Sequence, residues 1–302
     1  MSDKVTLANK IISGDKRSVA RGISLVEHDS STSENLIKEI FPATGKAYRV
    51  GITGPPGAGK STITNQLAKF YLSAGHKVGI IAVDPTSPFS GGALLGDRVR
   101  MSEIGMLEGI FIRSMATRGS LGGLSKKAVD AADVLDAAGY DYILFETVGV
   151  GQSELDIVKA ADTTIVVLVP ESGDSVQAMK AGLMEIADSY VVNKADRPGS
   201  EQAISAITTI LTLRPHDEHS WMPNIIKTVA PENKGIAELG AEIARHREYL
   251  TSSGAFNTHR EKQRNNRIKE LVQFKVLSPL MGDFDLYLKD VLTAGSQQDK
   301  SP

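Results

Sequence analysis

The chain has 302 residues and a formal net charge of -2, and 41% of its residues are hydrophobic and 23% charged. These values are typical of a soluble globular protein of one large or two modest domains, and they give no reason to expect a nucleic acid or an anionic membrane as the main partner. Zero cysteines exclude disulfides and thiolate metal sites, and without a signal peptide or a long apolar run we expect a cytoplasmic protein.

Residues 1–46 predict a helical extension of two or three short helices. Apolar residues recur there at helical spacing, and breaks fall at Gly14-Asp15 and at the polar stretch Asp29–Ser33. No catalytic motif is visible in this part of the chain.

A phosphate-binding loop follows the extension. The pattern G-x-x-x-x-G-K-[ST] is matched by Gly54-Pro55-Pro56-Gly57-Ala58-Gly59-Lys60-Ser61, between an expected strand, Tyr48–Thr53, and an expected helix, Thr62–Ala74. The glycines let backbone amides surround a phosphate, and the positive end of the helix dipole faces the same anion. We expect Lys60 to reach the outer phosphates and Ser61 to bind magnesium, with nucleotide contacts extending to Thr62.

Strand-like and helix-like segments alternate beyond this loop. The expected strands are Lys77–Val83, Gly109–Ile112, Tyr140–Glu146, Thr163–Val169, Ser189–Val192 and Asn224–Val229. The expected helices are Ser125–Ala138, Ser175–Ala187, Gln202–Leu213 and Gly235–Tyr249. Short apolar strands that alternate with helices predict an α/β fold with a doubly wound, mostly parallel sheet over residues 47–250. Such sheets bind ligands at the carboxyl ends of their strands.

Acidic residues at strand ends are candidate magnesium ligands. Asp84 ends a strand that we expect beside the phosphate loop, and Asp97 opens a helix after a glycine-rich loop. Both could join Ser61 and Glu146 around magnesium, which prefers oxygen ligands, but Asp97 is equally consistent with a helix cap. Arginines that could neutralise phosphoryl charge are Arg98, Arg100, Arg113 and Arg118, and nothing in the sequence chooses among them.

The segment Glu146-Thr147-Val148-Gly149 predicts a switch loop at the end of its strand. The carboxylate of Glu146 can hold the magnesium shell, and the amide of Gly149 can bind the terminal phosphate. A loop with both contacts would sense whether that phosphate is present.

A guanine-recognition motif, N-K-x-D, is present as Asn193-Lys194-Ala195-Asp196 directly after an expected strand. Asp196 can accept hydrogen bonds from the ring N–H and the amino group of guanine, a donor pair that adenine lacks. A carboxylate left unpaired by the wrong base costs about 1–3 kcal/mol. Asn193 and Lys194 would brace the loop and cover the base, and Val229-Ala230-Pro231 is placed to offer backbone amides to the guanine carbonyl.

Residues 251–302 predict one or two helices outside the main domain, with a disordered tail from about Gly295. The apolar stripe of this segment is consistent with docking on its own domain or on a second copy of the chain. His216 and His219 form an H-x-x-H pair in a polar stretch, which we interpret as a surface loop.

Taken together, these motifs resemble the methylmalonyl-CoA-mutase-associated GTPases, the MeaB or ArgK family, over most of the chain. The matching segments are Gly14–Arg17, Ile23–Glu27, Thr44–Arg49, the phosphate loop, Asp84–Gly92, Leu95–Met101, Glu146–Glu154 and Asn193–Asp196. Two features depart from the family: Val229 stands where a serine is usual, and the C-terminal region is short for the family's dimerisation arm.

The resemblance implies a P-loop GTPase that chaperones an adenosylcobalamin-dependent acyl-CoA mutase of the methylmalonyl-CoA mutase type, gates cofactor loading and protects the mutase. It implies GTP or GDP and Mg²⁺ as cofactors and favours a homodimer, and it leaves open whether an adenosyltransferase also binds. The magnesium-linked positions would be Ser61, Asp84, Asp97 and Glu146. The polar members of a third switch loop, Glu171–Lys180, would be Asp174, Gln177 and Lys180.

Two other functions are alternatives to this one. A nucleotide-dependent kinase or ATPase linked to periplasmic lysine, arginine and ornithine transport would tolerate ATP, and the guanine motif argues against it. A nickel or zinc metallochaperone GTPase is disfavoured because the chain has no cysteine and only 6 histidines.

Overall fold

The described part of the chain separates into two compact units. A computed structural model describes residues 6–28, 31–85, 102–117, 123–147, 160–172, 186–213, 216–217, 220–269, 271–273 and 276. The first unit is Met1–Phe256 and the second is Asn257–Pro302. The described residues of the second unit are helical.

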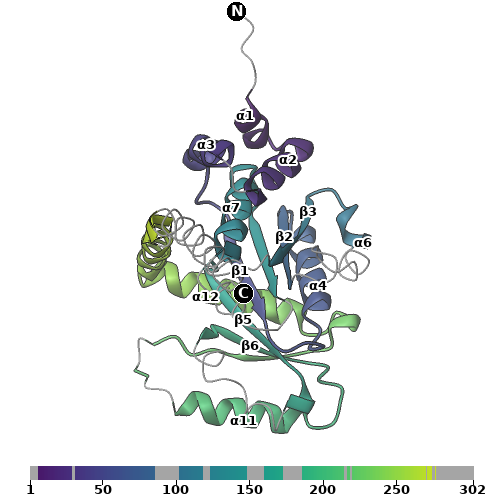
Figure 1. The fold of residues 1–302 in the computed structure, drawn as a ribbon. Coiled ribbons are helices and arrows are strands. Elements are labelled where there is room, and N and C mark those ends of the chain that lie inside the picture. The colour runs from purple at the N-terminus through teal and green to yellow at the C-terminus, as the bar shows by residue number, and fades with distance from the viewer. Residues whose placement is uncertain are drawn as a thin grey trace, which may run out of the picture. The chain divides into compact units, whose positions relative to one another are not determined.

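A parallel sheet forms the centre of the first unit (Figure 1). Its seven strands are β1 (Tyr48–Thr53), β2 (Val78–Pro85), β3 (Ile110–Thr117), β4 (Tyr142–Thr147), β5 (Thr163–Leu168), β6 (Ser189–Asn193) and β7 (Ile225–Thr228). They lie in the order β3-β2-β4-β1-β5-β6-β7, and each of these strands is parallel to its neighbours. The predicted doubly wound α/β architecture is therefore confirmed.

Two expectations about individual strands are wrong. β4 lies between β1 and β2, so the strand that carries Asp84 is not the neighbour of the phosphate loop's strand. The sequence predicts that β3 ends at Ile112, but the strand continues to Thr117, paired with β2 along its whole length. The apolar run breaks at Arg113, and only the pairing with β2, which is distant in sequence, extends the strand past it.

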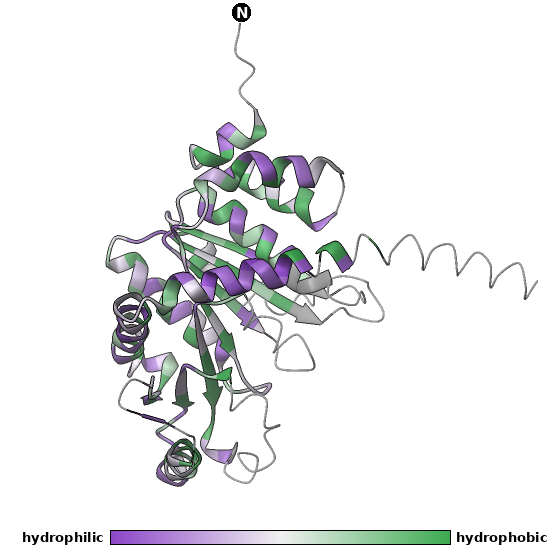
Figure 2. Ribbon diagram, turned by 90° about the vertical axis from the view of Figure 1, so that its left-hand side faces the viewer, coloured by the Kyte–Doolittle hydropathy of each residue, from purple (hydrophilic) through white to green (hydrophobic). Residues whose placement is uncertain are grey.

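Helices cover both faces of the sheet. The helix after the phosphate loop, α4 (Lys60–Ser73), and α12 (Ile236–Ser252) share one hydrophobic core with side chains of the central strands. α7 (Gly123–Ala137) packs on the other face, and α11 (Ser200–Thr212) forms a further core with β5 and β6. Figure 2 shows the hydrophobic colouring concentrated on the strands between these layers. Strands buried on both faces explain the continuous apolar runs in the sequence.

The N-terminal helices extend the core on the α7 side. They are α1 (Leu7–Ile12), α2 (Lys16–Glu27) and α3 (Ser31–Ile40), and their apolar residues belong to the same hydrophobic cluster as α7. Asp15 begins α2 by accepting a hydrogen bond from the Ser18 amide at 2.8 Å. The extension thus folds against the domain that carries the phosphate loop.

A buried ion cluster joins the extension to the sheet. Asp136 of α7 accepts hydrogen bonds from the amides of Gly45, Lys46 and Ala47, at 2.8, 3.1 and 3.0 Å. The Arg49 guanidinium lies 2.7 Å from Asp133 and 3.5 Å from Asp136. Burial disfavours the charge on Arg49, but the nearby carboxylates, Asp133 foremost, raise its pKa above the ordinary value. The cluster fixes the chain just before β1, which leads into the phosphate loop.

Within the described ranges, no helix is both long enough and apolar enough to span a membrane. The expected helix Ser175–Ala187 lies almost wholly outside the described residues. His216 is exposed, as expected of a surface loop, and His219 lies outside the described residues.

Candidate functional site

The phosphate loop leaves β1 and turns directly into α4, which begins at Lys60 rather than at Thr62. Gly54 and Gly59 have φ angles of 136° and 88°, in the region that favours glycine. A Cβ at Gly54 would clash with the Val167 carbonyl of the neighbouring strand, and a Cβ at Gly59 would clash with the Asn193 amide. Both glycines are therefore required by close packing as well as by backbone conformation.

Lys60 is buried within the loop that it ends. Its ammonium group donates hydrogen bonds to the carbonyl oxygens of Gly54 at 2.7 Å and Pro55 at 2.9 Å. The side chain thus already lies over the loop backbone, where a phosphate bound by the loop amides would lie close to its charge.

Ser61 and Glu146 meet although 85 positions separate them in the sequence. The Ser61 hydroxyl donates a hydrogen bond to Glu146 Oε1, because β4 is the neighbour of β1 and places Glu146 opposite Ile52. One residue further along, the Thr147 hydroxyl donates to the Thr53 hydroxyl at 3.1 Å. A hydroxyl and a carboxylate at the end of the phosphate loop fit magnesium, a hard cation with oxygen ligands.

Asn193 connects the predicted guanine loop to the phosphate loop. Its side chain is buried, and Nδ2 donates a hydrogen bond to the Ala58 carbonyl at 2.8 Å. Oδ1 accepts hydrogen bonds from the Thr228 hydroxyl at 2.9 Å and from the Ala230 amide at 3.2 Å. One amide group therefore holds together the phosphate loop, the end of β6 and the end of β7.

Lys194 makes a second connection between the two loops. Its φ angle of 57° is unusual for a residue other than glycine, and its ammonium group donates to the Gly57 carbonyl at 2.9 Å. The neighbouring Asp196 is exposed. Lys234 forms an ion pair with Glu232 at 2.6 Å, which raises the pKa of Lys234, and the charge of Asp196 adds to that shift. Asp196 therefore faces solvent within electrostatic range of Lys234.

The segment Val229-Ala230-Pro231 lies beside Asn193, but its amides are already engaged. The Val229 amide donates to the Lys234 carbonyl at 3.1 Å, and the Ala230 amide donates to Asn193. Pro231 has no N–H. A guanine carbonyl at this place would compete with these acceptors.

Several predicted residues lie outside what the structure describes. They are Asp97, Gly149, Asp174, Gln177 and Lys180, together with Arg98, Arg100 and Arg118. For Asp84 the structure describes the backbone, near the end of β2, but not the side chain. Arg113 forms an ion pair with Glu27 and a hydrogen bond of 3.1 Å with the Ser24 hydroxyl, both on α2. Its charge therefore holds the extension against β3.

Thr228 is a site residue that the sequence motifs do not reveal. Its hydroxyl fixes which way the Asn193 amide faces, so that Nδ2 points to the phosphate loop. In the sequence, the only indication that Thr228 belongs to the site is its position directly before Val229-Ala230-Pro231. The parallel register that places Thr228 opposite Asn193 is needed to recognise its role.

The described residues thus combine a phosphate loop, a lysine, a serine–glutamate pair and an exposed carboxylate on a loop fastened to the phosphate loop. Together these groups can bind the phosphates and the base of one nucleotide.

The sequence of this chain is similar to those of several named proteins. A sequence model described as "Methylmalonyl Co-A mutase-associated GTPase MeaB" matches residues 19–284. A Pyrococcus abyssi protein, provisionally named a GTPase, is 49% identical to this chain. The alignment covers 98% of this chain and 92% of the Pyrococcus protein. The mouse mitochondrial methylmalonic aciduria type A homolog is 33% identical over 88% of this chain and 68% of its own.

A solved structure supports the fold. A crystal structure described as that of an "LAO/AO transport system kinase" is similar with a TM-score of 0.76 and 30% identity, and it covers 100% of this chain and 95% of its own.

Proposed function

Since this chain belongs to the methylmalonyl-CoA-mutase-associated GTPase family MeaB, we propose that it hydrolyses GTP with Mg²⁺ and thereby chaperones an adenosylcobalamin-dependent acyl-CoA mutase. In this role it gates loading of the mutase cofactor and protects the mutase from inactivation. The observation that carries the nucleotide part is the hydrogen bond from Asn193 to Ala58, which joins a base-recognition loop to a phosphate loop.

The phosphates of GTP bind to the Lys60 ammonium group and to the backbone N–H groups of Gly54 and of residues 57–62, since Pro55 and Pro56 have no N–H. The Lys60 ammonium group exchanges its hydrogen bonds to the Gly54 and Pro55 carbonyls for the outer phosphates. Asp196 receives the ring N–H and the amino group of guanine, and Lys194 covers the base. Asp196 is exposed, so its carboxylate is accessible to the base.

Ser61 and Glu146 would hold Mg²⁺, which would supply positive charge to stabilise the phosphoryl group. Glu146 accepts a hydrogen bond from Ser61, so the two oxygens lie close enough to bind one ion. Asp84 and Asp97 complete the set by family resemblance. The Gly149 amide binds the terminal phosphate, and Glu146 and its loop orient the attacking water.

The output is a change in the loops that follow the carboxyl ends of the strands. Loss of the terminal phosphate releases the contacts of Gly149, and Asp174, Gln177 and Lys180 report that change to the mutase. We further propose that the chain works in the cytoplasm as a homodimer. An adenosyltransferase is a second candidate partner, because the cofactor must be delivered to the mutase.

The alternative function is a kinase or ATPase linked to amino-acid transport. It is favoured by the name of the similar solved protein, a transport system kinase that is 30% identical to this chain. Such an enzyme would use ATP and leave a phosphorylated protein, whereas the guanine-recognition loop of this chain favours GTP.

The proposal is tested by measuring GTP hydrolysis with and without an adenosylcobalamin-dependent acyl-CoA mutase from the same cell. We expect the chain to hydrolyse GTP slowly by itself and faster with the mutase. In Ser61→Ala we expect neither the slow nor the faster hydrolysis. A rate unchanged by every such mutase would contradict the chaperone role, whereas transfer of phosphate from ATP to a protein would favour the alternative. Glu201→Ala is a matched control, since Glu201 pairs with Lys227 on the exposed surface.

A further inference from the structure

An open pocket lies at the amino-terminal edge of the sheet, away from the phosphate loop. Its volume is about 390 Å³, and its lining residues are Tyr142, Ala244, Arg247, Glu248, Thr251 and Ser252. Tyr142 is the first residue of β4, whereas Glu146 lies near the other end of the same strand. A ligand in this pocket would therefore not share the nucleotide's contacts.

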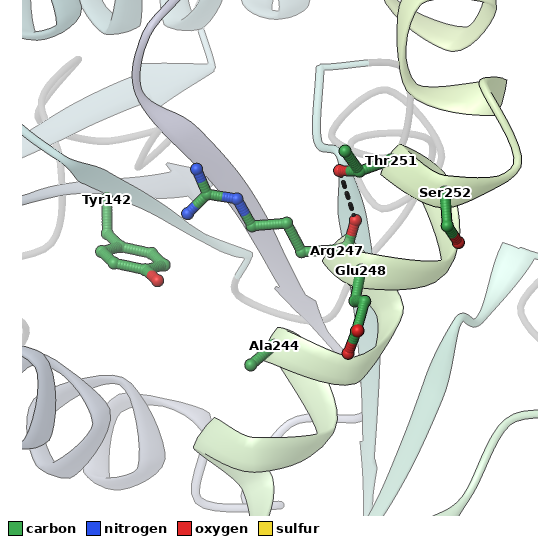
Figure 3. A pocket seen from close by; sticks show the side chains of 6 residues that line it. All are labelled: Tyr142, Ala244, Arg247, Glu248, Thr251 and Ser252. Atoms are coloured by element: carbon green, nitrogen blue, oxygen red, sulfur yellow. Dashed lines mark hydrogen bonds between the residues drawn. The ribbon is translucent and has the colours of Figure 1, made fainter.

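Arg247 supplies a positive charge at this pocket. Figure 3 shows its side chain reaching from α12 toward the ring of Tyr142, while Glu248 points in another direction. The guanidinium lies 5.0 Å from the centre of the Tyr48 ring. Among the residues that the structure describes, no carboxylate lies within ion-pair distance of Arg247. The neighbouring arginine on the helix, Arg245, contrasts with it because it is paired with Glu242 at 2.7 Å.

Tyr142, which lines the pocket, belongs to a cluster of aromatic rings. The rings of Tyr71 and Tyr142 stack with their centres 3.8 Å apart, and His76 meets Tyr142 edge-on at 5.2 Å. The Tyr71 side chain is buried, and within the described part of the chain its hydroxyl has no hydrogen-bond partner. Burial raises the pKa of Tyr71, and Arg247 opposes that shift, so the two groups lie within electrostatic range.

We propose that this pocket binds a small molecule that carries a flat ring and an anionic group. The anion would pair with Arg247, and the ring would lie against Tyr142 and the methyl group of Ala244. A volume of about 390 Å³ lies within the usual range for small-molecule sites, and an aromatic ring beside a few polar groups is typical of such sites. A guanidinium already placed over an aromatic ring also favours flat anionic partners.

The charge and the ring are tested separately with two probes of similar shape. 2-Naphthoate carries the anion, and 2-naphthalenemethanol is its neutral counterpart. Binding of each to the full chain is measured by saturation-transfer NMR and calorimetry, with saturating GDP present to fill the nucleotide site. We expect naphthoate to bind about tenfold more tightly than the alcohol, as one charge-assisted hydrogen bond would give.

Two arginine variants decide the assignment. Arg247→Gln should abolish the preference for naphthoate, while Arg245→Gln, on the same helix but already paired, should retain it. The proposal is overturned if naphthoate does not bind in the presence of saturating GDP, or if both variants behave alike. Circular dichroism of both variants ensures that a lost preference does not reflect unfolding. Because GDP is present throughout, the result does not depend on GTP hydrolysis or on a mutase.

Discussion

The Asn193 side chain donates a hydrogen bond to the carbonyl of Ala58 over 2.8 Å, across 135 positions of sequence. This contact fastens the predicted guanine loop, Asn193–Asp196, to the phosphate loop. It also makes nucleotide binding sensitive to any residue that orients the Asn193 amide.

Thr228→Val should weaken GDP binding. The variant keeps nearly the same volume but removes one of the two donors to Asn193 Oδ1 and leaves only the Ala230 amide, so the side-chain amide is held less firmly. Loss of one buried hydrogen bond of about 1 kcal/mol corresponds to a roughly fivefold rise in Kd, measured with a fluorescent GDP analogue. Thr228→Ser restores the hydroxyl and should restore affinity. Equal affinity of the Val variant and the wild type would contradict the role of Thr228.

Gly59→Ala should abolish nucleotide binding and destabilise the fold more than Gly75→Ala does. Both glycines have a φ angle of 88°, but a Cβ at Gly59 meets Asn193, whereas a Cβ at Gly75 meets nothing within 4 Å. Gly75→Ala, the control, should therefore be destabilised by backbone strain alone, by about 1 kcal/mol. Urea unfolding and GDP binding of the two variants separate strain from contact. Equal effects of the two substitutions would show that the contact with Asn193 does not matter.

Asp136→Ala should lower the free energy of unfolding by about 3 kcal/mol or more. It deprives three backbone amides of their acceptor and leaves the buried Arg49 with less negative charge around it. Arg197→Ala is the control, because it breaks an exposed ion pair with Glu171 and should change stability by less than about 1 kcal/mol. Both values follow from urea titrations. A similar small effect of the two variants would mean that the cluster contributes little.

Stability should fall in acid partly through Glu242. Burial raises the pKa of Glu242, but hydrogen bonds from Arg245 and Asn224 outweigh burial, so its pKa in the folded chain lies below the ordinary value. A folded pKa below the unfolded value gives stability that is present above the unfolded pKa and lost as pH falls through the folded pKa. Glu242→Gln should therefore have a lower free energy of unfolding than the wild type at neutral pH. Its free energy of unfolding should also fall less than that of the wild type as the pH is lowered from neutral to acid. Urea titrations across that pH range would measure both effects. An unchanged pH profile in the variant would contradict this assignment.

Local sequence patterns predicted the elements whose signals lie in contiguous residues. The phosphate loop between β1 and α4, the loop after β6 and most strands follow from apolar periodicity and turn residues. The strand order, with β4 between β1 and β2, and the extension of β3 past Arg113 depend on pairing between distant segments. The same is true of the site: the motif residues were visible, but the contacts of Thr228 with Asn193 and of Ser61 with Glu146 depend on sheet register.

The most direct test of the nucleotide site compares kcat/KM for GTP and ATP in the wild type and in Asp196→Ala. We predict that the wild type prefers GTP by at least about a hundredfold, because a site built to hydrogen-bond guanine leaves its carboxylate unpaired with adenine. The variant should lose most of that preference while it retains the phosphate contacts of Lys60. Equal use of GTP and ATP by the wild type would contradict a guanine-specific site.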